Sequence, residues 1–153
     1  MPYHLPPLRR EARVATTPVV AFEWFTTRIG TWWPRVLTAF GGSLGFVEGQ
    51  LEEHSADEVH VWGEVITWNA PHSLRMAWRQ PAHDEEQRTN VDVMFVPDGP
   101  SGAIVRIVQS GWNRIPDPAS SSRLYGGDRG WREVLTAYTT AVAGGLAIQR
   151  PDM

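Results

Sequence analysis

The sequence of 153 residues contains no cysteine and no lysine. The lack of cysteine excludes disulfides, thiolate nucleophiles and metal sites that use cysteine ligands. Since lysine is absent too, all 14 basic residues are arginines, and Schiff-base chemistry through a lysine is excluded. These two absences remove covalent catalysis by a cysteine thiol or a lysine amine from the functions open to this chain.

Long apolar runs and clusters of basic charge are also lacking. No apolar stretch approaches the roughly 18 residues that a membrane span needs. The start, Met1-Pro2-Tyr3-His4, has no basic region followed by an apolar core. The net charge is -3, with both signs interspersed along the chain. We therefore expect a cytoplasmic protein that neither spans a membrane nor binds nucleic acid.

Tryptophan is the abundant residue, with eight copies. Each indole brings a large apolar area and one N–H donor, so tryptophans can fill a core or line a pocket. The chain length predicts a single domain over residues 1–153, with its core at about residues 8–147. A domain of this size buries enough surface to fold without disulfides or a structural metal.

The last long apolar stretch predicts an amphipathic helix. At 100° per residue, one face of about 80° collects five large apolar side chains: Trp131, Leu135, Tyr138, Val142 and Leu146. Nearer the start, Thr17-Pro18 predicts the N-cap and first position of a shorter helix, which Gly30 would end. The apolar face of the C-terminal helix needs a cover, which the strands between the two helices can supply.

The rest of the chain reads as strands. A first strand is predicted near residues 8–15, and six more follow near 44–48, 49–54, 58–68, 73–80, 89–97 and 103–112. The connections are short and rich in turn residues, which predicts an antiparallel meander. Residues 115–129, rich in proline, serine and glycine, are predicted to be a loop that could act as a gate before the C-terminal helix.

Alternation within the strands predicts which side chains face the interior. Three strands each contribute an inward set: Leu74, Met76 and Trp78; Val91, Val93 and Phe95; Val105, Ile107 and Gln109. For residues 58–68 we predict Val59, Val61, Gly63 and Val65 inward, with a bulge able to reverse the end at Trp68.

Several short motifs occur in one order along the chain. They are Thr17-Pro18 with Ala21-Phe22, Trp32-Trp33-Pro34, Trp62-Gly63-Glu64-Val65, Trp68-Asn69-Ala70-Pro71, Val91-Asp92-Val93-Met94-Phe95, Ser110-Gly111-Trp112, and Gly130-Trp131 with Leu135. In this order the chain resembles the START-related (SRPBCC) superfamily over about residues 8–145, and within it the branch named after the activator of the heat-shock-protein ATPase. Two positions depart from the family pattern, with Glu48-Gly49 in place of a Gly-Gly pair and Gln109 in place of a histidine.

This resemblance implies an α+β helix-grip fold, in which a curved antiparallel sheet (β-α-α-β6-α) wraps around the long C-terminal helix and leaves a cavity between them. Members bind lipids, sterols, polyketides or other mostly apolar ligands, and some catalyse cyclisation or hydrolysis. The superfamily has no universal catalytic residue, so no catalytic role is carried over to this chain. A chaperone-associated interaction module, which would need a sizeable exposed apolar patch, is a further alternative.

We predict that the protein binds a small, mostly apolar molecule, lipid-like or aromatic, between the sheet and the final helix. The predicted ligand-binding residues are Trp33, Glu53, Val65, Met76, Trp78, Phe95, Ile107, Gln109, Trp112, Trp131, Leu135 and Tyr138. Gln109 and the Tyr138 hydroxyl are the polar groups expected to face the ligand, although water or a backbone carbonyl could also be their partner. The alternative is that the aromatic rings pack together as core.

Other chemistry has weaker support in the sequence. The segment with Glu52, His54, Glu58 and His60 would pair His54 with Glu58 and Glu52 with His60 on an outward face, so we expect charge pairs there and no metal. Glu53 has inward parity, and an arginine partner is favoured over catalysis. No Gly-x-Ser-x-Gly or phosphate-binding motif occurs, and we predict no cofactor and no catalytic residue.

An enzyme of the cyclase or hydrolase type is the alternative function. It would require Gln109, Tyr138 and Glu53 to converge on one point. A homodimer is one assembly compatible with the sequence.

Overall fold

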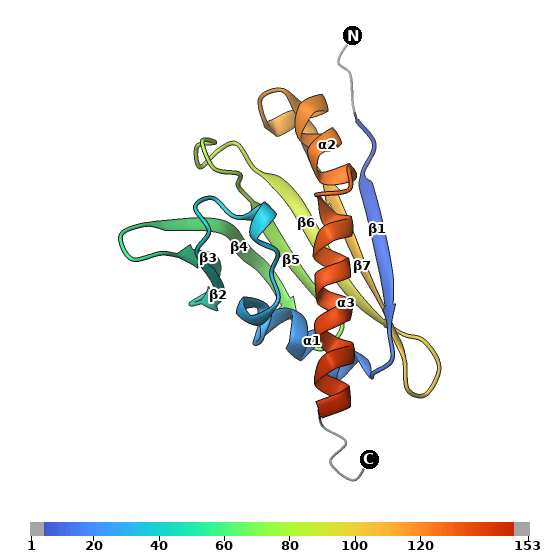
Figure 1. The fold of residues 1–153 in the computed structure, drawn as a ribbon. Helices are drawn as coiled ribbons and strands as arrows, with labels where there is room; N and C mark the ends of the chain where they lie inside the picture. The colour runs from blue at the N-terminus through green and yellow to red at the C-terminus, as the bar shows by residue number, and fades with distance from the viewer. Residues whose placement is uncertain (1–4, 149–153) are drawn as a thin grey trace.

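The computed structural model describes residues 5–148, which form a seven-stranded antiparallel sheet that curves around one long helix (Figure 1). The strand order is β1-β7-β6-β5-β4-β3-β2. The elements are β1 (Leu8–Val14), α1 (Pro18–Thr26), the 3-10 turns Ile29–Thr31 and Arg35–Leu37, β2 (Ser43–Val47), β3 (Gln50–His54), β4 (Val59–Asn69), β5 (Ser73–Trp78), β6 (Thr89–Pro97), β7 (Ala103–Ser110), the 3-10 turn Trp112–Arg114, α2 (Pro118–Gly126) and α3 (Trp131–Ile148). The predicted helix-grip fold is therefore confirmed.

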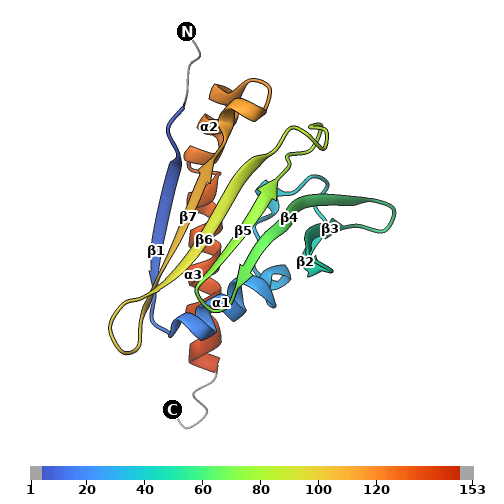
Figure 2. The ribbon, with the colours of Figure 1, turned by 180° about the vertical axis from the view of Figure 1, so that it is seen from behind.

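The helices cover one face of the sheet. α3 runs along the sheet and contacts β1 (Figure 1), α1 packs against β6 and β7, and the 3-10 turn Ile29–Thr31 packs against β2. Seen from behind, the sheet lies in front of α3, and none of the helices formed by residues 5–148 covers its other face (Figure 2). Among residues 5–148, no α-helix combines the length and the apolar character that crossing a membrane would require. The fold thus has one covered face, which holds the core, and one open face.

α3 buries the predicted apolar stripe. Trp131, Leu135, Tyr138 and Val142 are at most 5% exposed, and Leu146 is partly buried against the same core. At the other end of the chain, Thr17 caps α1 by accepting a hydrogen bond from the Val20 N–H. α1 ends at Thr26, earlier than the predicted end at Gly30, because the chain tightens into a 3-10 turn from Ile29.

The inward faces of β5, β6 and β7 agree with the predicted alternation. Their inward residues are all nearly inaccessible: Leu74, Met76, Trp78, Val91, Val93, Phe95, Val105, Ile107 and Gln109. Leu74 pairs with Val93 and Val93 pairs with Ile107, so the three sets form one continuous apolar surface across the strands. This surface is the floor on which α3 lies.

β4 differs from the prediction in its first half. Val59 is 57% exposed whereas Trp62 is 3% exposed, so the assignment of Val59 and Val61 to the interior is wrong. The register explains the difference, because Leu51 pairs with Gly63 while Glu52 pairs with Val61, which leaves Trp62 as an extra residue in a bulge. A second irregularity between Val65 and Thr67 realigns the far end of the strand.

The predicted loop at residues 115–129 is also wrong, because its middle forms α2. Pro118 stands at the start of this helix, where its fixed φ and missing N–H are tolerated. α2 is held by Tyr125, which is 1% exposed and stacks on Trp131 at a ring distance of 5.2 Å. The segment thus contains a packed helix, which lies at the top of α3 in Figure 1.

Candidate ligand-binding site

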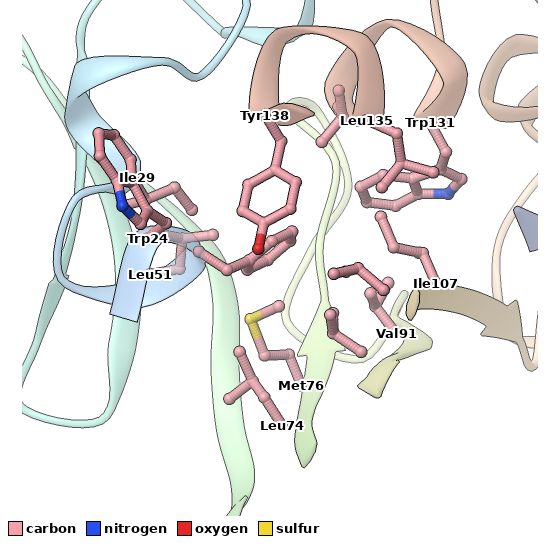
Figure 3. Close-up of a cluster of buried hydrophobic side chains, with 14 of the residues drawn as sticks. Trp24, Ile29, Leu51, Leu74, Met76, Val91, Ile107, Trp131, Leu135 and Tyr138 are labelled. Carbon is pink, nitrogen blue, oxygen red and sulfur yellow. The ribbon is translucent and has the colours of Figure 1, made fainter. Parts of the chain in front are cut away.

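Most of the predicted site residues form a closely packed aromatic interior. Trp78 lies against Trp131 at a centroid distance of 5.3 Å, and Trp33 lies against Trp78 at 6.2 Å. Trp131, Leu135 and Tyr138 point from α3 toward Met76, Val91 and Ile107 of the sheet (Figure 3). Trp78, Phe95, Trp112, Trp131 and Tyr138 are each at most 2% exposed. The sequence thus identified the residues between sheet and helix, and these rings fill the space by packing on one another.

The two polar groups expected to face a ligand are bonded to the protein. The Trp131 indole donates to the Gln109 side-chain oxygen at 2.8 Å, and the Gln109 amide donates to the Thr89 hydroxyl at 2.9 Å. The Tyr138 hydroxyl donates to the Ala21 carbonyl at 2.7 Å, and burial raises the pKa of this phenol. Tyr138 therefore stays neutral and ties α3 to α1, with a backbone carbonyl as its partner.

Glu53 lies on the inner face as predicted, but its partners are not arginines. Its fully buried carboxylate accepts hydrogen bonds from the backbone N–H groups of Ala39, Phe40 and Gly42 at 2.7 to 3.0 Å. A fourth bond comes from the Trp62 indole at 2.8 Å. The loop before β2 folds over the end of β3, and its N–H groups supply what an arginine would otherwise provide. The expected arginine pairing is thus corrected.

The same contacts set the protonation of Glu53. Burial by itself would raise the pKa of this carboxyl, but the hydrogen bonds from Ala39, Trp62, Phe40 and Gly42 together outweigh it and hold the pKa below the ordinary value of 4.5. A buried carboxylate with these partners is ionised at neutral pH. It serves to fix the loop above the inner face.

We predict an acid-labile contribution to stability from Glu53. Because its folded pKa is lowered, its contribution is complete above the unfolded pKa near 4.5 and is lost as the pH falls through the folded pKa. The free energy of unfolding, measured by urea titration from pH 6 to pH 3, should fall less steeply with acid in Glu53→Gln than in the wild type. Parallel curves for the two proteins would contradict this assignment.

The polar groups required for acid–base catalysis do not converge. Glu53 on β3 and Gln109 on β7 are separated in the sheet by β4, β5 and β6. Tyr138 bonds to α1, so each of the three groups has its own protein partner. Within the described chain, this arrangement gives no support to a catalytic site built from these residues.

The Glu/His hairpin has a different register from the predicted one. His54 pairs with Val59 and Glu53 with His60, because the turn extends to Glu58, whose carbonyl accepts from the Ser55 N–H at 2.9 Å. His54 instead bonds to Glu52 of its own strand at 2.7 Å. Within residues 5–148, no group of three or more histidine or acidic side chains is arranged to hold a metal ion.

The inner face reaches solvent at the ends of β2 and β4. Phe46 pairs with Leu51, Val65 with Met76 and Trp68 with Leu74, and since the three partners are buried, Phe46, Val65 and Trp68 also lie on the inner face. Together with Glu48 and Gly49 they line a hollow of about 330 Å³. We call this group the Trp68 hollow.

Aromatic contacts connect the Trp68 hollow with the core. Trp68 is 48% exposed, and its ring meets the Phe46 ring at 5.4 Å and the Phe22 ring at 5.2 Å, both nearly perpendicular. Phe22 in turn packs edge-on against Phe95 at 5.1 Å. Among the predicted site residues only Val65 lines this hollow. Leu135 lines a separate hollow of about 340 Å³ between β1 and α3.

Comparisons with known proteins agree with this architecture. No curated protein sequence matches the chain. Among solved structures, the anthrahydroquino-gamma-pyrone synthase Txn09, complexed with SUM, is 29% identical, with a TM-score of 0.60 over 92% of this chain and 99% of that one. The self-sacrificing resistance protein CalC from Micromonospora echinospora is 21% identical, with a TM-score of 0.66 over 92% and 96% of the two chains.

A third structure belongs to a named branch of the same fold. The Aha1 dimer from Colwellia psychrerythraea is 12% identical, with a TM-score of 0.62 over 90% of this chain and 96% of that one. The family described as Activator of Hsp90 ATPase homolog 1-like protein matches residues 13–143. Because this match covers most of the chain, the chain belongs to the family of Activator of Hsp90 ATPase homolog 1-like proteins.

Proposed function

We propose that the protein binds a small, mostly apolar molecule with an aromatic ring in the Trp68 hollow. The observation that carries this proposal is that the inner face, buried elsewhere under α1 and α3, is open at Phe46, Val65 and Trp68. A volume of about 330 Å³ suits a ligand of one or two rings. The perpendicular rings of Phe46 and Trp68 can hold such a ligand by face and edge contacts.

Two further points support a ligand at this end of the fold. The aromatic interior between the sheet and α3 is occupied by protein rings, so a ligand at the Trp68 hollow needs no rearrangement of the core. The synthase at 29% identity, which has the same fold, is complexed with SUM. Chemistry on the ligand is not part of the proposal, because Glu53, Gln109 and Tyr138 do not converge.

The proposal predicts that Trp68→Ala weakens binding of 2-naphthylmethanol about tenfold, because one aromatic wall is lost. Binding is measured by ¹H–¹⁵N chemical-shift titration, which also follows the tryptophan indole signals. In the wild type the Trp68 indole signal should move with the same midpoint as the backbone signals of Val65 and Gly49.

The matched control is Ile66→Ala. Ile66 lies on the same strand and is 56% exposed but does not line the hollow, so its loss should leave the affinity unchanged. Because Trp68 also contacts Phe22, the spectrum and melting temperature of Trp68→Ala must first show a folded protein. If folded Trp68→Ala binds the naphthalene as well as the wild type does, the ligand lies elsewhere and the proposal is wrong.

A further inference from the structure

The rim of the Trp68 hollow carries a carboxylate on an unusual backbone. Glu48 and Gly49 form the two-residue turn between β2 and β3, with φ values of 47° and 81°. A turn with two positive φ values favours asparagine, aspartate and glycine, and a glutamate there is uncommon. The side chain at this position is therefore held at a conformational cost, and it lines the hollow.

Glu48 forms no ion pair with the described part of the chain. The ion pairs among the described residues join other groups, and none of them involves Glu48. Glu48 is exposed, and an added Cβ at the adjacent Gly49 would meet no atom within 4 Å. Among residues 5–148 Glu48 thus makes no ion pair, and it lines the same hollow as Phe46 and Trp68.

This combination has a defined chemical preference. Aromatic faces attract cations through the ring quadrupole, and the attraction is strongest for tryptophan. Two perpendicular rings and a carboxylate line the same hollow, and this set of groups favours a positive group and repels an anion. A neutral ligand would gain only the ring contacts.

We propose that the Trp68 hollow selects aromatic amines, with the ring packed against Phe46 and Trp68 and the ammonium group facing Glu48. This inference rests on the proposed function, since it names the class of ligand for the same hollow. It adds a charge requirement that the apolar proposal does not contain.

The test compares three probes that share one ring system and differ in charge: 2-naphthylmethylammonium, 2-naphthylmethanol and 2-naphthoate. At pH 7, chemical-shift titration of the wild type should give about five- to tenfold tighter binding of the ammonium than of the alcohol, and the weakest binding for the carboxylate. In Glu48→Gln the ammonium should lose most of this advantage over the alcohol, because only the attraction of the aromatic rings for the cation remains.

Two further variants separate the site from general charge effects. Glu48→Gly also removes the carboxylate while relieving the positive φ, so it should show the same loss of selectivity in a protein at least as stable. Glu58→Gln removes one exposed carboxylate from the turn between β3 and β4 and should keep the wild-type selectivity.

The outcomes distinguish this inference from the proposed function. Equal binding of ammonium and alcohol at the hollow in the wild type overturns the charge requirement and leaves the apolar site standing. The role of Glu48 is also overturned if Glu48→Gln keeps the full wild-type preference for the ammonium over the alcohol. The same holds if Glu58→Gln loses this preference as much as Glu48→Gln does. If none of the three probes moves the Trp68 signals, both proposals fail.

Discussion

Replacing Glu53 with alanine should lower the free energy of unfolding by about 3 to 5 kcal/mol. The fully buried carboxylate accepts from three backbone N–H groups and from the Trp62 indole, and the substitution leaves all four donors without an acceptor. Each unsatisfied buried donor costs about 1 to 3 kcal/mol, and water entering the vacated space would recover part of it. In a protein of this length the melting temperature should fall by about 10 °C.

Two other variants define the cause. Glu53→Gln keeps the side-chain volume and one oxygen acceptor but turns an N–H₂ group toward the donors. We therefore expect its free energy of unfolding to lie between the values for the wild type and Glu53→Ala. Glu58→Ala removes an exposed carboxylate between β3 and β4, and it should change the free energy of unfolding by less than about 0.5 kcal/mol. Urea unfolding at pH 7 measures all three. A loss below about 1 kcal/mol in Glu53→Ala would mean that water replaces the carboxylate.

The features predicted well from sequence depend on local pattern. The stripe Trp131, Leu135, Tyr138 and Val142 follows from helical spacing alone, and the burial of Leu74, Met76 and Trp78 follows from strand alternation. Neither needs knowledge of which element packs against which. With the short turns between strands, these patterns were enough to predict the fold class.

The errors arise where pairing between strands decides the outcome. Trp62 and Gly63 are consecutive yet both buried, which strict alternation forbids and a bulge against β3 permits. Three of the four partners of Glu53 are backbone N–H groups, which any sequence supplies, so the residues gave no signal for them. β2 and β4 lie on either side of β3, and the contact between the Phe46 and Trp68 rings could not be read from either strand alone.

α2 was missed although the chain contained a signal for it. Asp117-Pro118 repeats the pattern of Thr17-Pro18, in which a polar residue precedes a proline at the helix start. The serines that follow give the segment little apolar periodicity, and the helix is fixed mainly by the packing of Tyr125 on Trp131. A tertiary contact, rather than intrinsic helix preference, thus decides its structure.

Gly145→Ala should destabilise the protein by about 1 to 3 kcal/mol, because α3 crosses α1 at this glycine. A Cβ at position 145 would overlap the six-membered ring of Trp24. Trp24 cannot move aside freely, since it is 8% exposed, its ring carries the Arg28 guanidinium at 4.7 Å, and its carbonyl accepts from the Trp32 indole at 2.8 Å. The added methyl group must therefore push the two helices apart.

The neighbouring Gly144 provides the matched control, because the two glycines should respond in opposite directions. A Cβ at position 144 would meet no atom within 4 Å, so Gly144→Ala gains only helix propensity, about 0.5 to 1 kcal/mol. Gly145→Ala has the same propensity gain, and the difference between the two variants therefore isolates the contact with Trp24. Thermal unfolding should show the melting temperature rising in Gly144→Ala and falling in Gly145→Ala. If both rise, the end of α3 does not pack on Trp24 in solution, and Tyr138, through its bond to Ala21 and its ring contact with Phe25, would hold the two helices together.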